Sequence, residues 1–184
     1  YTKMLPLEKM IELCDKINLP IILIGGKADF DKGEQLVKFF TENQTDHSIE
    51  EGLQKLNKKA KIFNGCGKFN LGQSASLVKN AHVVFAHDTG FAHVAAGFKK
   101  TIYSIWGGTV PLYFYPFETK FIILENKNLA CRPCSKNGRS SCPKKHSHAH
   151  KDLVAFIDFL PPLWFKIVNY KFPFTSSRLV AIVD

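Results

Sequence analysis

The sequence predicts an α/β fold of the Rossmann-like type, in which helices cover both faces of a parallel sheet. Short continuous apolar runs end at glycines, as Ile21–Ile24 does at Gly25-Gly26, and this is typical of strands buried on both faces. Between these runs lie segments whose apolar residues recur at helical spacing. Strands that alternate with helices form right-handed βαβ units, and these build a parallel sheet.

The expected elements follow one another along the chain at the spacing of such units. Strands are expected at residues 21–24, 61–63, 81–86, 101–105 and 121–124. Helices are expected at residues 7–17, 29–40, 71–80 and 90–96, with a short one around 49–56 and another from 152. Pro6 suits the first turn of the first helix, and Asp29 has the side chain of an N-cap residue for the second.

Residues 1–160 form one expected domain, which includes a loop of cysteines and histidines at 131–150. Pro161-Pro162 ends the last expected helix, because proline removes a helical hydrogen bond and clashes with the preceding turn. Residues 161–184 are apolar and aromatic without a clear period, so we expect a tail of unassigned structure. The first residue is Tyr1 rather than Met, and we expect the chain to begin inside a longer protein.

The basic composition bears on the partners of the chain. Its 184 residues carry 25 Lys and Arg against 16 Asp and Glu, a formal charge of +9. Such a surface favours anionic partners: a phosphorylated substrate, an anionic membrane face or nucleic acid. Lysine pairs such as Lys99-Lys100 are too short for nucleic-acid tracts, and aromatic residues do not alternate with basic ones as in single-strand binders. We therefore expect no nucleic-acid partner.

No segment of the sequence has the pattern of a membrane span or a secretory leader. A spanning helix needs about 18 or more consecutive apolar residues, and the chain has no such run. Residues 1–6 contain no apolar stretch behind a basic start, so they are not a signal peptide. The expected location is the cytoplasm.

The strongest local motif runs from Ala86 to His93, with the sequence Ala-His-Asp-Thr-Gly-Phe-Ala-His. It follows an expected buried strand and opens a helix, and ligands bind at that edge of open α/β sheets. Free N–H groups and the helix dipole there favour a phosphate, to which Thr89 adds a hydroxyl and Gly90 close backbone approach. Taken alone, the motif also fits a simpler interpretation, in which Asp88 caps the helix and His93 is a core histidine.

A second loop, Gly107-Gly108-Thr109, follows the next expected strand. Paired glycines allow a tight turn beside a ligand, and Thr109 offers another hydroxyl. An ordinary strand-to-loop turn has the same pattern. Since the carboxyl ends of neighbouring parallel strands lie at one edge of the sheet, the two loops together predict a ligand that carries phosphate.

A third motif combines Cys131, Cys134 and Cys142 with His146. Two cysteines two residues apart, a third cysteine and a histidine are one possible ligand set for tetrahedral zinc. A loop whose thiols only pack and a disulfide inside the loop remain alternatives. We commit to no metal and keep these four residues as weak candidates.

Four ordered motifs of the chain resemble glycosyltransferase family 9, the family of ADP-heptose:lipopolysaccharide heptosyltransferases. The segment Lys3-Met4-Leu5-Pro6 is similar to the entry of the family's C-terminal domain. The residues from Asp88 to Ala96 are similar to its D-[ST]-G-x-x-H-x-A-A signature, and Gly108–Pro111 to its G-x-T-x-P loop. The residues from Cys131 to His146 resemble its cysteine tail, although the Cys-Met pair that usually follows is absent.

The resemblance implies the C-terminal, donor-binding half of a GT-B fold. Carried over by motif, Asp88, Thr89, Gly90 and His93 face the diphosphate and sugar of the donor. Lys3 is then a cationic contact that stabilises charge on the leaving diphosphate.

Three further donor contacts follow from a looser alignment. Thr109 is a second-tier contact, Asp29 lies near the ribose, and Phe69 lies near the adenine.

The resemblance also implies partners and a reaction for the whole protein. The expected substrate is a nucleotide-sugar donor, ADP-heptose, and no cofactor is required. The catalytic carboxylate and the site for a lipid-linked saccharide acceptor are expected in an N-terminal domain that this sequence lacks. The sugar is expected to be transferred with inversion, and this fragment alone to be inactive. A peripheral contact with the anionic inner face of the cytoplasmic membrane would suit the basic charge.

Two other functions remain as alternatives. One is a zinc-stabilised nucleic-acid-binding module, which the charge of +9 and the cysteine and histidine loop would suit. The other is a different GT-B enzyme, such as a sugar-nucleotide epimerase.

Overall fold

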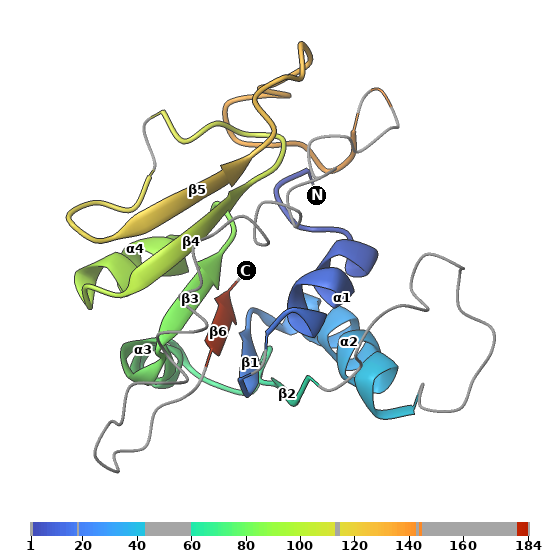
Figure 1. Cartoon of the computed structure of the whole chain (residues 1–184), viewed down its shortest axis with the longest axis vertical. Helices are drawn as coiled ribbons and strands as arrows, with labels where there is room; N and C mark the ends of the chain where they lie inside the picture. The colour runs from blue at the N-terminus through green and yellow to red at the C-terminus, as the bar shows by residue number, and fades with distance from the viewer. Residues whose placement is uncertain are drawn as a thin grey trace.

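The computed structural model describes residues 2–17, 19–42, 60–112, 115–142, 144 and 180–183. Within them a sheet of six strands has the order β2-β1-β6-β3-β4-β5, and each neighbouring pair is parallel. Helices α1 and α2 lie on one side of this sheet, and α3 and α4 lie on the other (Figure 1). The predicted α/β, Rossmann-like fold is therefore confirmed.

The described elements follow the predicted ones closely. The strands are β1 (Ile21–Ile24), β2 (Ile62–Asn64), β3 (Val83–Ala86), β4 (Thr101–Trp106), β5 (Phe121–Glu125) and β6 (Val180–Val183). The helices are α1 (Leu7–Asp15), the 3₁₀ turn η1 (Lys27–Asp29), α2 (Phe30–Glu42), α3 (Leu71–Asn80) and α4 (Gly90–Gly97). The helices expected at 49–56 and from 152 lie outside the described residues.

The core has two layers because neighbouring residues of a strand point to opposite faces of the sheet. In β1, Ile21 and Leu23 pack with α1 and α2, whereas Ile22 and Ile24 pack with α3 and α4. β3 and β6 alternate in the same way between the two layers. The layer under α4 is rich in alanine, so this helix lies close to the sheet.

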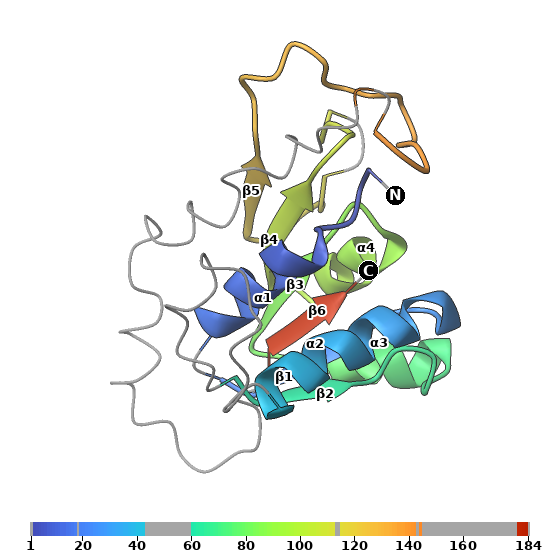
Figure 2. The ribbon, with the colours of Figure 1, turned by 90° about the vertical axis from the view of Figure 1, so that its right-hand side faces the viewer.

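The strand β6 differs from the expectation of a tail over residues 161–184. Val180–Val183 is fully buried and pairs with β1 on one side and β3 on the other. It occupies the middle of the sheet in two perpendicular views (Figures 1 and 2). The expected boundary after residue 160 therefore does not hold for these four residues. The sequence signal available for this strand was the apolar run Val180–Val183, which resembles the run of β1.

The role of Asp29 at the start of α2 also differs in detail from the expected N-cap. Asp29 is the last residue of η1, which continues directly into α2. Its Oδ2 accepts a hydrogen bond of 2.7 Å from the backbone N–H of Gly26. The carboxylate thus stabilises the turn after β1 rather than an N–H group in the first turn of α2.

In the part of the chain that the structure describes, no helix is long and apolar enough to cross a membrane.

Candidate functional site

The candidate site lies at the carboxyl edge of the sheet, where the N-terminal segment crosses the ends of β3 and β4. In Figures 1 and 2 this segment runs from the N-terminus to α1, beside the loop that follows β5. Thr2 connects to both neighbouring loops: its carbonyl accepts from Gly108 N–H at 2.6 Å, and its N–H donates to the Arg139 carbonyl at 2.8 Å. The segment that carries Lys3 is therefore part of the edge.

Lys3, Asp88 and Thr109 meet at this edge, although they come from three separate segments. The Nζ of Lys3 lies 2.8 Å from Oδ2 of Asp88. The same oxygen accepts a hydrogen bond of 2.9 Å from the hydroxyl of Thr109. The Asp88 side chain is 13% exposed and that of Lys3 28%, so both are reachable from solvent while their geometry is fixed.

The position of Lys3 depends on a buried histidine beside Asp88. Nε2 of His87 accepts a hydrogen bond of 3.2 Å from the backbone N–H of Leu5. The carbonyl of the same residue, Leu5, accepts a hydrogen bond of 2.6 Å from Nζ of Lys32 in α2. His87 is only 2% exposed and directly follows β3. The rigid end of β3 and the first turn of α2 thus hold the backbone two residues after Lys3.

Thr109 is more deeply buried than we expect of a side chain that contacts the donor. It is 1% exposed, and its hydroxyl hydrogen is directed to Asp88. In this geometry the Thr109 hydroxyl orients the Asp88 carboxylate through Oδ2. The direct contact to the donor that we expected for Thr109 thus remains a prediction that this geometry does not favour.

Thr89, Gly90 and His93 surround the beginning of α4. Thr89 is the N-cap residue with an extended backbone, and its side chain makes no capping hydrogen bond among the described residues. Gly90 is exposed, and a Cβ added there would have no described atom within 4 Å. His93, on the first turn, is exposed and is therefore not a core histidine. The helix N-terminus is open toward solvent, which is the arrangement that favours an anion.

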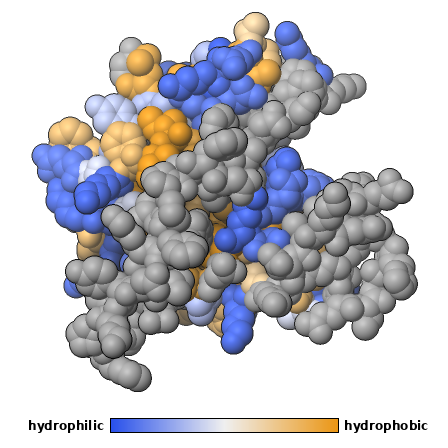
Figure 3. All heavy atoms as spheres, viewed as in Figure 1, coloured by the Kyte–Doolittle hydropathy of each residue, from blue (hydrophilic) through white to orange (hydrophobic). Residues whose placement is uncertain are grey.

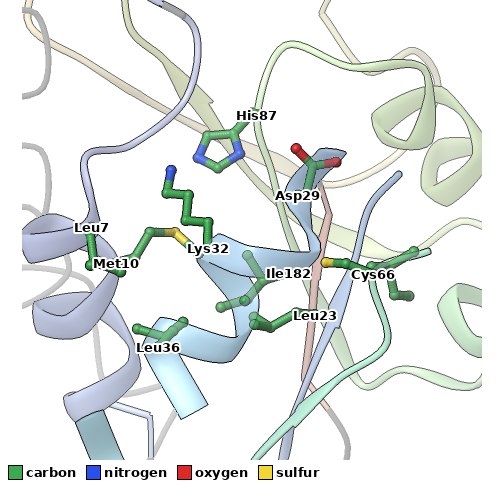
Figure 4. A pocket seen from close by; sticks show the side chains of 11 residues that line it. Leu7, Met10, Leu23, Asp29, Lys32, Leu36, Cys66, His87 and Ile182 are labelled. Carbon is green, nitrogen blue, oxygen red and sulfur yellow. The ribbon is translucent and has the colours of Figure 1, made fainter. Parts of the chain in front are cut away.

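A hollow beside this edge is lined by α1, α2, β1, β6 and the residues that follow β2 and β3. Apolar side chains such as Met10, Leu36 and Ile182 form most of its wall. The polar ends of Asp29, Lys32 and His87 gather at one end of it (Figure 4). Asp29, the predicted ribose contact, therefore shares a cavity with the residue that precedes Asp88.

Phe69, the predicted adenine contact, lies further along the edge, in the loop after β2. Its ring is half-buried and lies 6.4 Å from the exposed ring of Phe63, measured between centroids. Two strands, β1 and β6, separate β2 from β3. Because neighbouring strands are about 4.8 Å apart, the ends of β2 and β3, which Phe69 and Asp88 follow, are about 14 Å apart along the edge.

The loop with Cys131, Cys134 and Cys142 contacts the site through its backbone. These cysteines are half-buried, and the described residues contain no group of three or more side chains that could hold a metal ion. His146 lies outside the described residues. Instead, Cys134 donates its N–H to the Gly108 carbonyl at 2.7 Å, next to Thr109. The described part of this loop therefore packs on the candidate site.

Sequence reasoning missed the residues that position the site. These residues are His87, Thr2 and Arg132. They act through contacts with residues far away in the sequence, and such contacts cannot be predicted from a local motif. Only the place of His87, directly before Asp88 at a strand end, could have drawn attention to it.

Comparisons with known proteins bear on the family and the fold of the chain. The family described as glycosyltransferase family 9 (heptosyltransferase) matches residues 27–145. The lipooligosaccharide heptosyltransferase 2 of Haemophilus influenzae is 31% identical over 94 residues, which cover 48% of this chain and 27% of that protein. The chain thus spans about a quarter of the length of this relative.

Two solved structures have a similar fold. The ADP-heptose LPS heptosyltransferase II of E. coli matches with a TM-score of 0.55 at 17% identity, over 85% of this chain and 44% of that one. A glycosyl transferase family 9 structure from Veillonella parvula matches with a TM-score of 0.56 at 16% identity, over 86% of this chain and 42% of that one.

Proposed function

Because the chain belongs to glycosyltransferase family 9, the heptosyltransferase family, we propose that it binds a nucleotide-sugar donor along the carboxyl edge of its sheet. In this proposal the base lies near Phe69, the ribose near Asp29, and the diphosphate and sugar at the ends of β3 and β4. The donor is an ADP-sugar, and its sugar is a heptose.

The observation that carries the proposal is the order of these residues along the edge. Phe69 follows β2, Asp29 follows β1, Asp88 follows β3 and Thr109 follows β4, and the sheet order is β2-β1-β6-β3-β4. The strand ends thus lie in the order in which base, ribose, and diphosphate with sugar follow one another in the donor. A nucleotide sugar extended across these strand ends would place its base near Phe69, its ribose near Asp29, and its diphosphate and sugar at the ends of β3 and β4, as ligands of open α/β sheets do.

The charge of each residue determines which part of the donor it can bind. A diphosphate only accepts hydrogen bonds at neutral pH, and so does the carboxylate of Asp88, so the two do not bind each other directly. The diphosphate instead takes the ammonium of Lys3 and the open N-terminus of α4 at Gly90. Asp88 orients Lys3 and accepts from sugar hydroxyls.

The reaction of the whole protein extends beyond this chain. We propose that a further domain supplies the acceptor site and the catalytic carboxylate, and that the sugar passes with inversion to a lipopolysaccharide-type acceptor. The matched relatives are more than twice as long as the segment they share with this chain, and this length leaves room for such a domain.

We propose a peripheral contact with the anionic inner face of the cytoplasmic membrane as part of the same function. Leu112 and Phe117 are each 66% exposed, and Tyr115 is 43% exposed, all in the segment between β4 and β5. Apolar side chains also gather over β5 on the face shown in Figure 3. The chain as a whole has a net charge of +9, and exposed apolar side chains on a cationic protein suit an anionic lipid surface.

A calorimetric titration of the chain with ADP, ADP-heptose, UDP and GDP tests the donor proposal. We expect saturable binding of ADP and ADP-heptose with Kd values on the order of micromolar to 100 micromolar, and weaker binding of the other two nucleotides. If neither ADP nor ADP-heptose binds at millimolar concentration, the proposal is wrong. A product assay on the full-length protein with ADP-heptose separates transfer from epimerisation.

A further inference from the structure

We propose that Arg132 is a positioning residue for the donor diphosphate, acting through the Thr109 loop and Asp88. The inference rests on the proposed function. It adds a residue outside the strand-end motifs to the binding machinery, and it gives the cysteine-containing loop a role.

The guanidinium of Arg132 ties together the carboxyl ends of β4 and β5. Its Nη2 donates to the Thr109 carbonyl at 2.6 Å and lies 3.1 Å from Oε2 of Glu125. The same nitrogen lies 3.4 Å from the Trp106 carbonyl, and Nη1 donates to the Asn126 carbonyl at 2.6 Å. Four groups are thus held by one planar side chain.

Burial of this ion pair excludes direct contact between Arg132 and the donor in this arrangement. The Arg132 side chain is 4% exposed and that of Glu125 10%, and Glu125 balances the charge of the guanidinium. Arg132 therefore acts on the site through the residues it holds. The path is short: it fixes the Thr109 backbone, the Thr109 hydroxyl donates to Asp88, and Asp88 holds Lys3.

The loop that carries Arg132 also holds Lys3 from the other side. Arg139 donates its N–H to the Thr2 hydroxyl at 2.8 Å, next to Lys3. Gly138 has a φ of +79°, and a Cβ at this position would lie 2.9 Å from Cγ of Lys3. The loop therefore packs directly against the aliphatic part of Lys3, so that both partners of Asp88 depend on it.

Lysine cannot replace Arg132 without loss of these contacts, because an ammonium lacks the planar guanidinium that binds several fixed acceptors at once. Arg132→Lys keeps the charge opposite Glu125 and removes that geometry. We expect the variant to bind ADP about tenfold more weakly, while AMP, which lacks the β-phosphate, binds within about twofold of the unchanged chain.

Lys127→Gln is the matched control. Lys127 lies 3.7 Å from Oε1 of the same Glu125, but its side chain is 78% exposed. No contact between Lys127 and the Thr109 loop is recorded among the described residues. This control should leave the affinity for both nucleotides unchanged.

Calorimetry of the chain separates positioning from a purely structural role. A folding defect reduces the number of binding sites per chain, whereas a positioning defect changes Kd at an unchanged number of sites. In a Thr109→Val background, Arg132→Lys should weaken ADP binding by a smaller factor than in the unchanged chain, because the path through the Thr109 hydroxyl is already broken.

The outcomes are distinct. An unchanged ADP affinity in Arg132→Lys, an equal loss for ADP and AMP, or full additivity with Thr109→Val would overturn the inference while ADP binding by the unchanged chain still stands. An unchanged chain that fails to bind ADP would instead remove the proposed function, and the inference with it.

Discussion

The ammonium of Lys3 lies 2.8 Å from Oδ2 of Asp88, so the N-terminal segment is joined by an ion pair to the turn between β3 and α4. This pair forms the centre of the candidate site, since Thr109 donates to the same carboxylate oxygen. The side chains are partly exposed, and an arriving diphosphate can therefore compete with Asp88 for the ammonium.

Lys3→Gln should weaken ADP binding roughly ten- to a hundredfold, because a charge-assisted contact to the diphosphate is lost. Titration calorimetry at low and high salt measures this effect, and the difference from the unchanged chain should shrink as salt rises. Lys9→Gln is the control, since it removes a lysine with a similar carboxylate partner, Glu12, within α1. Equal affinities of Lys3→Gln and Lys9→Gln would argue against a role of Lys3 in the donor site.

Gly90→Ala should weaken ADP binding without lowering stability. A Cβ at Gly90 meets no described atom within 4 Å, so any loss of affinity must come from the ligand side. A methyl group at the open end of α4 keeps a phosphate away from the helix N–H groups, and we expect a loss of about tenfold. The control is Gly97→Ala at the other end of α4, where the added Cβ is equally free. Unchanged affinity in Gly90→Ala would mean that the phosphate does not bind at this helix.

Gly108→Ala should destabilise the fold and displace Lys3. The added Cβ would lie 2.6 Å from both Cβ and Oγ1 of Thr2, and 3.2 Å from its carbonyl oxygen. The Gly108 N–H also donates to that carbonyl, so the segment must move as a whole. We expect the free energy of unfolding to fall by about 1–3 kcal/mol in urea titrations. A variant as stable as the unchanged chain would show that the segment can move without cost.

His82 should make the fold less stable as the pH falls below about 6.5. His82 is exposed at the surface, but partial desolvation of its ring, and secondarily the positive charge of Lys100, lowers its pKa below the ordinary value of 6.5. The unfolded chain then takes up the proton at a higher pH than the folded one, so stability declines as the pH falls from 6.5 through the folded pKa. His82→Gln should remove this part of the pH dependence, measured by urea unfolding at about pH 7.5 and 5.5.

Lys100→Gln tests the cause of that shift. Because desolvation is the larger cause, this variant should weaken the pH dependence without abolishing it. NMR titration of the His82 ring reports the pKa directly. A pKa at or above 6.5 in the folded chain would contradict the prediction.

The strand-end motifs could be predicted from sequence because their signals are local. Ile21–Ile24 and the run before Asp88 are continuous apolar stretches that end at turn residues, and each became a buried strand. The strand β6 was missed, although Val180–Val183 has the same pattern, because it follows a long segment with no periodicity. Its insertion between β1 and β3 depends on long-range pairing, which local patterns do not encode.

The sequence by itself determined the α/β class, the two loops at one edge of the sheet and the family motifs. These follow from hydrophobic periodicity and turn residues, which act over a few positions of the chain. Only the tertiary structure decided which polar groups meet: Lys3 with Asp88, Thr109 turned toward that carboxylate, and Arg132 behind Thr109. Their contacts join segments far apart in sequence, and they form because buried polar groups need partners once the core has brought the segments together.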